Sequence, residues 1–90
     1  MNKTELVKQM AVIGGLTQTQ AADALEALCT AVADELGAGG EVRIAGFGTF
    51  AVQHRAERQG RNPKTGEAVT IAAHRVVKFK AGKVLRDAVA

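Results

Sequence analysis

The sequence predicts an α+β fold in which two helices are followed by strands that carry a basic β-ribbon. Apolar residues recur at helical spacing over roughly residues 6–36, whereas later stretches alternate apolar and polar residues in the manner of strands. A strong turn signal, Arg61-Asn62-Pro63-Lys64-Thr65-Gly66, contains the only proline of the chain. Because arginines crowd the approach to this turn, the ribbon that it closes should be strongly basic.

Two helices are expected before the first strand. Each starts with a capping pair, a polar residue followed three positions later by Glu or Gln, and the pairs are Asn2 with Glu5 and Thr17 with Gln20. The first helix should cover about residues 3–13 and stop at Gly14-Gly15. The second should be the longest, and its apolar stripe, the expected main core element, is Ala21, Leu25, Leu28, Val32 and Leu36. Its acidic character argues against a helix-turn-helix that reads DNA.

Strands and a short helix should occupy the second half. The residues that show strand alternation are Val42 and Ile44, Phe50, Val52 and His54, Val69 and Ile71, and finally Val76, Val77 and Phe79. Gly46-Phe47-Gly48 should form a tight corner that holds Phe47 in the core. The same tripeptide lacks the rest of any phosphate-binding fingerprint. Ala81-Gly82 should end the last strand, before a short helix over Lys83–Val89.

We expect one domain over residues 1–90. It should consist of a helical hairpin and first strand over 1–45, a sheet over 46–80 that includes an arm at about 53–75, and a C-terminal helix over 81–90. If the arm projects, about 65 to 70 residues remain to form the body, which is marginal for a single hydrophobic core. We therefore expect the protein to oligomerise.

The arm should be exposed to solvent. Residues 55–67 contain almost no apolar side chains, so this segment cannot build a core of its own. Asn before Pro63 favours a turn, and Gly66 can adopt a positive φ where the chain returns. We expect the segment to project into solvent and to fold against a partner, and disorder of the free arm stays open.

The charge is divided between the two halves of the chain. The net charge of +3 combines −3 over residues 1–45 with +6 over residues 46–90. A basic half of this kind favours a polyanion as the ligand. The only aromatic residues are three phenylalanines, which argues against the stacking platforms that bind single strands.

The sequence indicates neither an enzyme, nor a metal centre, nor a membrane protein. Cys29 is the only cysteine, which suits a reducing compartment, and its place beside the apolar stripe predicts a small buried hydrophobe. His54 and His74 fall on the two sides of the ribbon, but two histidines without a third ligand make neither a metal site nor a catalytic set. Without a signal peptide or an apolar window of about 18 residues, a cytoplasmic protein without cofactors is expected.

Four motifs, in this order along the chain, resemble the bacterial histone-like HU family. They are Asn2-Lys3-Thr4-Glu5-Leu6, Gly46-Phe47-Gly48-Thr49-Phe50, Gly60-Arg61-Asn62-Pro63-Lys64-Thr65-Gly66 and Phe79-Lys80-Ala81-Gly82-Lys83. The resemblance covers the full length. It implies an intertwined dimer with an α-helical base, a three-stranded antiparallel sheet that forms a saddle, and protruding β-ribbon arms. By the same resemblance, the two arms reach around double-stranded DNA through its minor groove.

The resemblance also implies which residues contact DNA. Pro63 would be the wedge between base steps, Asn62 would help to form the tip, and Gln53 stands where the family often has a basic residue. The full set is Lys3, Gln53, Arg55, Arg58, Arg61, Asn62, Pro63, Lys64, Arg75, Lys78, Lys80, Lys83 and Arg86. The chain also departs from the family pattern at Ala72 and Val77, where prolines are common.

The predicted function is that of a non-enzymatic architectural protein of the bacterial nucleoid. It should bend and compact double-stranded DNA with low sequence specificity and favour nicked, gapped or flexible sites. A homodimer is expected, and a heterodimer with a paralogue stays open. The alternatives are an integration-host-factor-like subunit that reads defined sites by shape, and an interaction module whose basic arm docks on an acidic protein. RNA stays open as a partner because phosphate contacts do not report the sugar.

Overall fold

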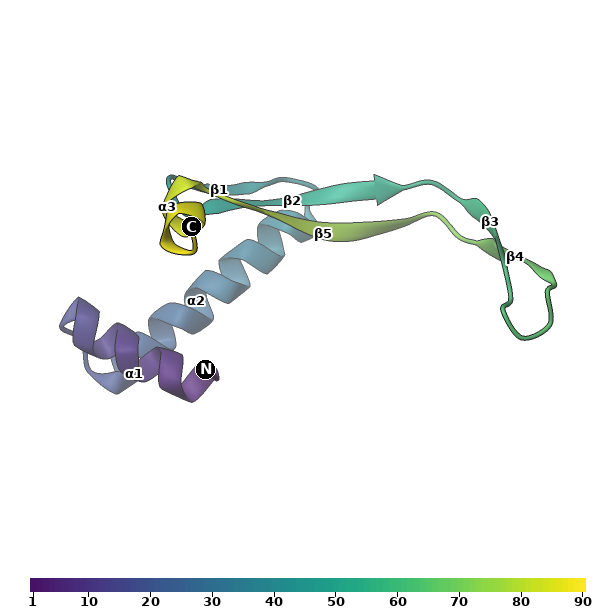
Figure 1. The fold of residues 1–90 in the computed structure, drawn as a ribbon. Helices are drawn as coiled ribbons and strands as arrows, with labels where there is room; N and C mark the ends of the chain where they lie inside the picture. The colour runs from purple at the N-terminus through teal and green to yellow at the C-terminus, as the bar shows by residue number, and fades with distance from the viewer. The chain divides into compact units, whose positions relative to one another are not determined.

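The computed structural model describes all 90 residues and confirms the α+β fold class (Figure 1). In chain order, the elements are α1 (Lys3–Gly14), α2 (Gln18–Gly37), β1 (Val42–Ile44), β2 (Gly48–Arg55), β3 (Arg58–Arg61), β4 (Ala68–Ile71), β5 (His74–Ala81) and α3 (Lys83–Ala88). They form two compact units, a helical one over Met1–Glu35 and one over Leu36–Ala90 that holds all the strands and α3. None of the helices has the length and apolar character that a membrane span requires.

The helical unit starts both of its helices with the caps that the sequence predicts. At α1, the Asn2 side-chain oxygen accepts a hydrogen bond from the Glu5 N–H at 2.9 Å. At α2, the Gln20 N–H donates to the Thr17 hydroxyl at 3.1 Å, and the Thr17 N–H donates to Gln20 Oε1 at 3.0 Å. Each cap contributes about 0.5–2 kcal/mol by satisfying backbone donors that lack a partner within the helix. α1 ends at Gly14, one residue beyond the predicted boundary.

Little apolar surface is buried within the single chain. Ala11, Ala21 and Leu36 are the buried hydrophobic residues, and no large side chain is fully buried. The predicted stripe of α2 is uncovered in its middle, where Leu28 is 47% exposed. Cys29 follows it and is exposed as well, so its predicted burial is wrong for the single chain. The reason is the same for both residues, since the rest of the helical unit leaves this part of α2 uncovered.

In the second unit, three antiparallel strands form a sheet in the order β1-β2-β5. One of its faces is apolar, because Phe50 pairs with Phe79 and Val52 pairs with Val77 across the strands. The ring centroids of Phe50 and Phe79 are 4.7 Å apart. Phe47 meets Phe79 edge-on at 5.8 Å but keeps 42% of its surface exposed, so the prediction that the corner holds it in the core is wrong. A corner at the rim of a three-stranded sheet covers only one side of such a ring.

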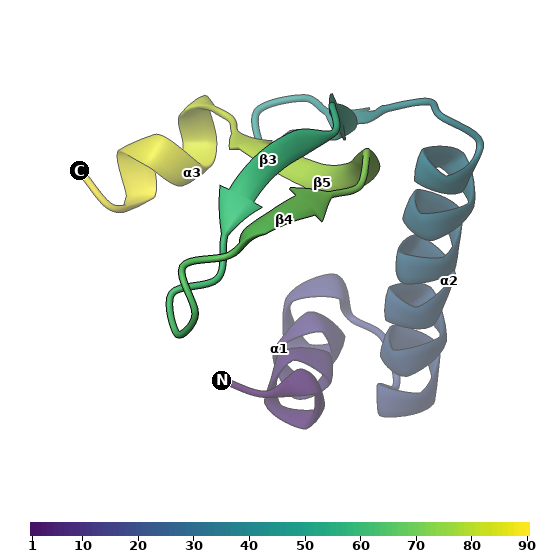
Figure 2. The same cartoon turned by 90° about the vertical axis from the view of Figure 1, so that its right-hand side faces the viewer.

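Beyond the sheet, β3 and β4 form a second antiparallel ladder that carries the turn. Figure 2 shows these strands side by side, leading to the turn at their outer end. The Gln59 amide donates across the ladder to the Thr70 hydroxyl at 3.3 Å. Ile71 covers the ribbon where Gly60 has no side chain, its Cδ1 lying 3.2 Å from the point that a Cβ would occupy. The segment whose order the sequence left open is therefore a paired ribbon, because the returning strand supplies the apolar contact that residues 55–67 lack.

The corner between β1 and β2 is tied to the junction of β5 and α3. The Gly82 N–H donates to the Phe47 carbonyl at 2.7 Å, and the Val84 N–H donates to the Gly46 carbonyl at 2.9 Å. The two backbone segments approach so closely that a Cβ on Gly82 would lie 2.5 Å from the Gly46 oxygen. Because this neighbour is backbone, it cannot rotate away, and only glycine fits at this junction.

Replacing Gly82 with alanine should lower the free energy of unfolding by about 1–3 kcal/mol, since the added methyl group forces the corner apart. Urea unfolding followed by circular dichroism measures this change. Gly37→Ala is the matched control, because no atom lies within 4 Å of its added Cβ. That variant should be unchanged or slightly more stable. Equal urea midpoints for the two variants would contradict a tight junction at Gly82.

Candidate nucleic-acid interface

The register of the sheet gathers polar and basic side chains on the face opposite the phenylalanines. Arg43 pairs with Thr49, Thr49 pairs with Lys80 on its other side, and Ala51 pairs with Lys78. Side chains of directly paired residues point to the same side of a sheet. These five residues define what we call the basic face.

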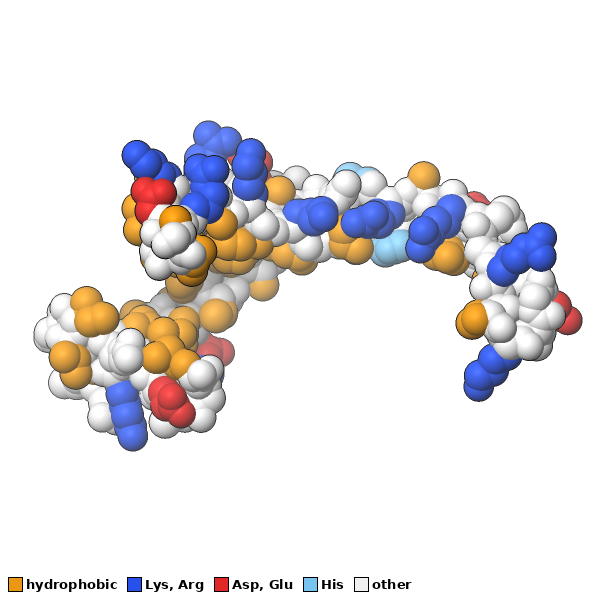
Figure 3. All heavy atoms as spheres, in the orientation of Figure 1, with side chains coloured by type: hydrophobic (Ala, Val, Ile, Leu, Met, Phe, Trp, Pro, Cys, Tyr) orange, Lys and Arg blue, Asp and Glu red, His pale blue; other side chains and the backbone are white.

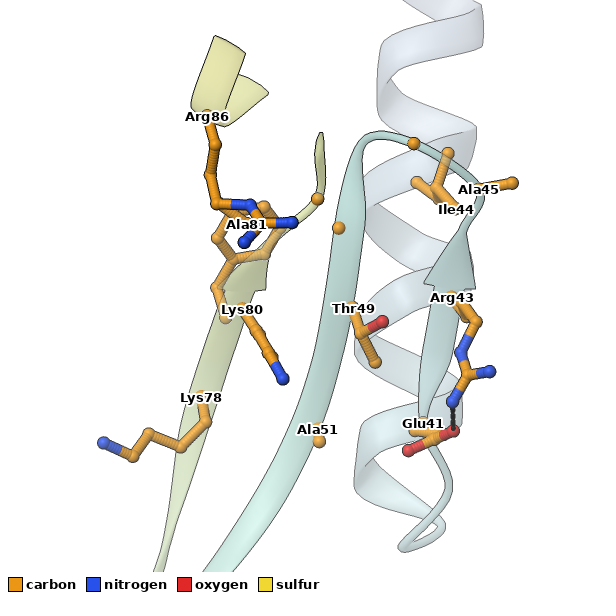
Figure 4. A pocket seen from close by; sticks show the side chains of 14 residues that line it. Glu41, Arg43, Ile44, Ala45, Thr49, Ala51, Lys78, Lys80, Ala81 and Arg86 are labelled. Atoms are coloured by element: carbon orange, nitrogen blue, oxygen red, sulfur yellow. Dashed lines mark hydrogen bonds and ion pairs between the residues drawn. The ribbon is translucent and has the colours of Figure 1, made fainter. Parts of the chain in front are cut away.

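An open hollow of about 760 Å³ lies over the basic face (Figure 4). Four cationic residues line it: Arg43 from β1, Lys78 and Lys80 from β5, and Arg86 from α3. The one carboxylate among the lining residues is that of Glu41. The four cations of the lining and the open shape suit an extended anion that lies across the strands rather than a small molecule enclosed in a pocket.

The same face of β2 and β5 extends into the arm, through the uncharged pair Gln53 and Val76 to Arg55. Gln53 and Arg55 follow Ala51 at every second position, and His74 is the cross-strand partner of Arg55. Figure 3 shows Lys and Arg side chains succeeding one another over the strands and the arm. Arg75 is different, since its partner is His54 and the pair lies on the apolar side of the ladder. The structure therefore separates Arg75 from Gln53 and Arg55.

The two arginines of β3 also lie on different sides of the ribbon. Arg58 pairs with Ile71 and Arg61 pairs with Ala68, at two positions that are three residues apart. Successive side chains of a strand point to opposite faces, so two residues three positions apart lie on opposite faces of the ribbon. Arg61 is directed at the turn, where its Nη1 donates to the Gly66 carbonyl at 3.5 Å.

The turn at the tip is closed largely by Asn62. Its carbonyl accepts from the Gly66 N–H at 2.7 Å, its N–H donates to the Glu67 carbonyl at 2.8 Å, and its side-chain oxygen accepts from the Lys64 N–H at 2.9 Å. Gly66 has a φ of 73°, which confirms the predicted positive value. Pro63 lies next to Asn62 in this turn and is exposed. An uncharged, rigid ring is thus presented at the outer end of the ribbon.

Lys3 belongs to the helical unit, apart from the other predicted contacts. Its Nζ lies 3.2 Å from Glu26 Oε2, and both side chains are about two-thirds exposed, at 68% and 69%. The structure therefore shows Lys3 paired with a carboxylate, and its assignment as a DNA contact stays a prediction. Lys83, in the first turn of α3, is exposed and has no ion pair.

The two histidines do not meet. His54 and His74 lie on neighbouring strands, but their partners in the ladder place them on opposite faces. Instead, His74 Nδ1 lies 3.0 Å from the Ala72 carbonyl oxygen. No group of three or more His, Cys, Asp or Glu side chains in the structure is arranged to hold a metal ion.

Two charged residues of the hollow, Arg43 and Glu41, are missing from the set predicted from the sequence. The signal for Arg43 was present, because a residue between two inward-facing positions of a strand, here Val42 and Ile44, must point to the other side. What the strand pattern could not show is that this side is shared with Lys80. That information lies in the pairing of three strands.

The charge division follows the two structural units. Residues 36–90 carry ten Lys and Arg against four Asp and Glu, a net charge of +6, whereas residues 1–35 have a net charge of −3. The strand-containing unit is therefore the basic one. It holds every predicted DNA contact except Lys3.

Comparison with known proteins confirms the resemblance to the HU family. The bacterial DNA-binding protein family matches residues 1–90. The chain is 52% identical over 88 residues to DNA-binding protein HU-beta of Neisseria meningitidis serogroup A, covering 98% of this chain and 99% of that protein. It is 51% identical over 89 residues to HU-alpha of Escherichia coli, covering 99% of each. The Anabaena HU–DNA cocrystal structure superposes with a TM-score of 0.92 at 42% identity and covers 100% of this chain and 98% of that one. The chain therefore belongs to the family of bacterial DNA-binding proteins that includes HU-alpha and HU-beta.

Proposed function

We propose that this chain, a DNA-binding protein of the HU type, is a non-enzymatic architectural protein that bends and compacts double-stranded DNA with low sequence specificity. The observation that carries the proposal is the arrangement of basic side chains along the sheet and the arm. The basic face runs from the hollow over the sheet along β2 and β5 toward a ribbon whose exposed tip is a proline. The similar Anabaena protein was crystallised with DNA, which supports the same partner here.

Affinity would come from phosphate contacts. The cations of the arm and of the sheet are long, exposed side chains, and none of them except Arg43 has an ion-pair partner. Such side chains neutralise phosphates without reading bases. The proposed contacts are Lys3, Gln53, Arg55, Arg58, Arg61, Asn62, Lys64, Arg75, Lys78, Lys80, Lys83 and Arg86. Because Arg58 and Arg61 lie on opposite faces of the ribbon, an arm lying in a groove can present one to each strand of the duplex.

Bending would come from the tip. Pro63 has no charge and no backbone donor, so it adds little to phosphate attraction. A rigid apolar ring at the end of the ribbon can enter between two base steps, offsetting part of an unstacking cost of a few kcal/mol. DNA that kinks at low cost, such as nicked, gapped or flexible-step DNA, should be preferred. Such a partner places the protein in the nucleoid, within the cytoplasm.

The active form would be a dimer. The single chain leaves Leu28, Val77 and Phe79 exposed by 47%, 64% and 43%. Each Å² of apolar surface that a partner chain covers contributes about 25 cal/mol. A second copy can cover these residues and bring a second arm, and a paralogue with the same apolar pattern could do so as well.

If the chain needs its partner in order to fold, a substitution that prevents association should also unfold it. Leu28→Asp places a charge in the proposed interface and should cost more than about 3 kcal/mol, so the chain should unfold as it dissociates. Sedimentation and circular dichroism measure both effects. Gln9→Asp is the control, because Gln9 is an exposed polar residue of α1 and the variant should stay folded and dimeric. A folded, monomeric Leu28→Asp protein would contradict the dimer.

Phosphate-based affinity predicts a strong dependence on salt. Each phosphate contact contributes about −0.9 to the slope of log affinity against log salt concentration. Arg58→Ala removes one contact from each of two arms, so the slope should flatten by about 2 and binding should weaken on all sequences alike. Gln59→Ala, one residue away and uncharged, should leave the slope as it is. A loss confined to one sequence would instead favour a site-specific protein of the integration-host-factor kind.

The wedge predicts that bending and binding separate. Pro63→Ala should reduce the bend of an intact duplex, because alanine fills the gap between base steps only partly. Its affinity for a nicked duplex should change by less than about threefold, since stacking is already broken there. Energy transfer between the ends of a labelled duplex, run beside binding to the same duplex with a nick, measures both. If Pro63→Ala bends intact DNA like the parent, Pro63 only forms the turn.

A further inference from the structure

We propose that Glu41 competes with DNA for Arg43 and so withholds one cation of the basic face from the phosphate backbone. Glu41 would then limit the affinity of the sheet for DNA without taking part in binding. The inference rests on the proposed function, because it concerns the same surface. It assigns roles to two residues that the sequence did not place in the site.

The geometry puts the two side chains on the same side of the sheet. Glu41 immediately precedes β1 and stands two positions before Arg43, and residues two apart in an extended chain share a face. Glu41 Oε1 lies 3.4 Å from Arg43 Nη2, as the dashed line in Figure 4 marks. Both line the hollow that Lys80 and Arg86 also line.

Among the cations of this hollow, Arg43 is the one that already has a partner. The structure contains two ion pairs, Lys3–Glu26 on the helices and Arg43–Glu41 here. Lys78, Lys80 and Arg86 have none. A phosphate that approaches the hollow therefore meets three free cations and one that is neutralised.

The pair is not needed to hold the fold together. It joins two residues that are two positions apart in the same segment, so it links no separate elements of the structure. Both side chains are largely exposed, Arg43 by 74% and Glu41 by 56%, and exposed ion pairs of this kind contribute little to stability. Its consequence is thus expected in binding and not in folding.

Exchanging the Arg43–Glu41 ion pair for a contact between Arg43 and a phosphate carries an energetic penalty. A guanidinium forms strong charge-assisted hydrogen bonds with phosphate, so Arg43 is chemically suited to the contact. If Arg43 turns to contact a phosphate, however, the carboxylate of Glu41 is left unpaired close to that phosphate. The two negative charges then repel each other. The gain and the penalty offset each other, which leaves Arg43 with little net contribution while Glu41 is ionised.

The test is a set of salt titrations on one intact duplex with the parent, Glu41→Gln, Arg43→Gln and the double variant. Glu41→Gln should bind about three- to tenfold more tightly at low salt and steepen the slope of log affinity against log salt by about 2 per dimer. Arg43→Gln should leave the slope of the parent unchanged, since no contact is lost. The double variant should also show the slope of the parent, because the freed arginine is absent.

A control separates a freed contact from a simple change of net charge. Glu35→Gln removes the same charge from an exposed residue of α2 that has no ion pair, and its slope should equal that of the parent. Urea midpoints of Glu41→Gln and Arg43→Gln should match that of the parent, as expected for a pair that does not support the fold. A marked fall in either midpoint would show that the pair is structural.

Two results would overturn the inference. If Arg43→Gln flattens the slope by about 2, then Arg43 already contacts phosphate in the parent and Glu41 withholds nothing. If Glu41→Gln leaves the slope unchanged, then the arginine does not turn to DNA when freed. If the parent and Arg58→Ala behave as expected in the same titrations, either result contradicts the role of Glu41 and leaves the proposed function intact. A parent that shows no salt-dependent binding would defeat the proposed function with it.

Discussion

The register between β2 and β5 is the constraint on which the functional surface depends. Because successive side chains in a strand point to opposite sides, the pairing of Thr49 with Lys80 assigns every other residue of both strands to a face. It places Phe50 and Phe79 together on one side and leaves Arg43 and Lys78 on the other. A slip of one residue would mix the apolar and basic sets, and neither the proposed dimer interface nor the proposed phosphate-binding surface would remain.

A second constraint is the scarcity of buried apolar surface. A chain of 90 residues whose strands extend into an arm cannot enclose a large side chain, and the structure contains none that is fully buried. The folded elements are instead stabilised locally, by the caps at Asn2 and Thr17 and by the close backbone contact at Gly82. The apolar face of the sheet and the middle of α2 stay exposed in the single chain, and the proposed dimer would link the stability of this protein to its assembly.

The tip, the arm and the sheet differ in how their charged side chains are arranged. At the tip, Asn62 closes the turn with two backbone hydrogen bonds and one to its side chain, and the neutral ring of Pro63 is exposed beside it. Along the arm, arginines alternate between faces, so that cations point to both sides of the ribbon. On the sheet, cations gather on one face, where Glu41 is the single opposing charge. Under the proposed function, each region would offer DNA a different kind of contact.

The sequence by itself determined the parts of this protein that depend on neighbours within a few residues. The caps at Asn2 and Thr17, the turn at Pro63 and the order of helices and strands all follow from such local chemistry. The paired arm, the exposure of Cys29 and Phe47, the separation of Arg75 from Arg55 and the pairing of Arg43 with Glu41 in the hollow were decided only by the tertiary structure. The physical reason is that these properties depend on which residues, distant in sequence, lie opposite each other, and a local pattern carries no information about register.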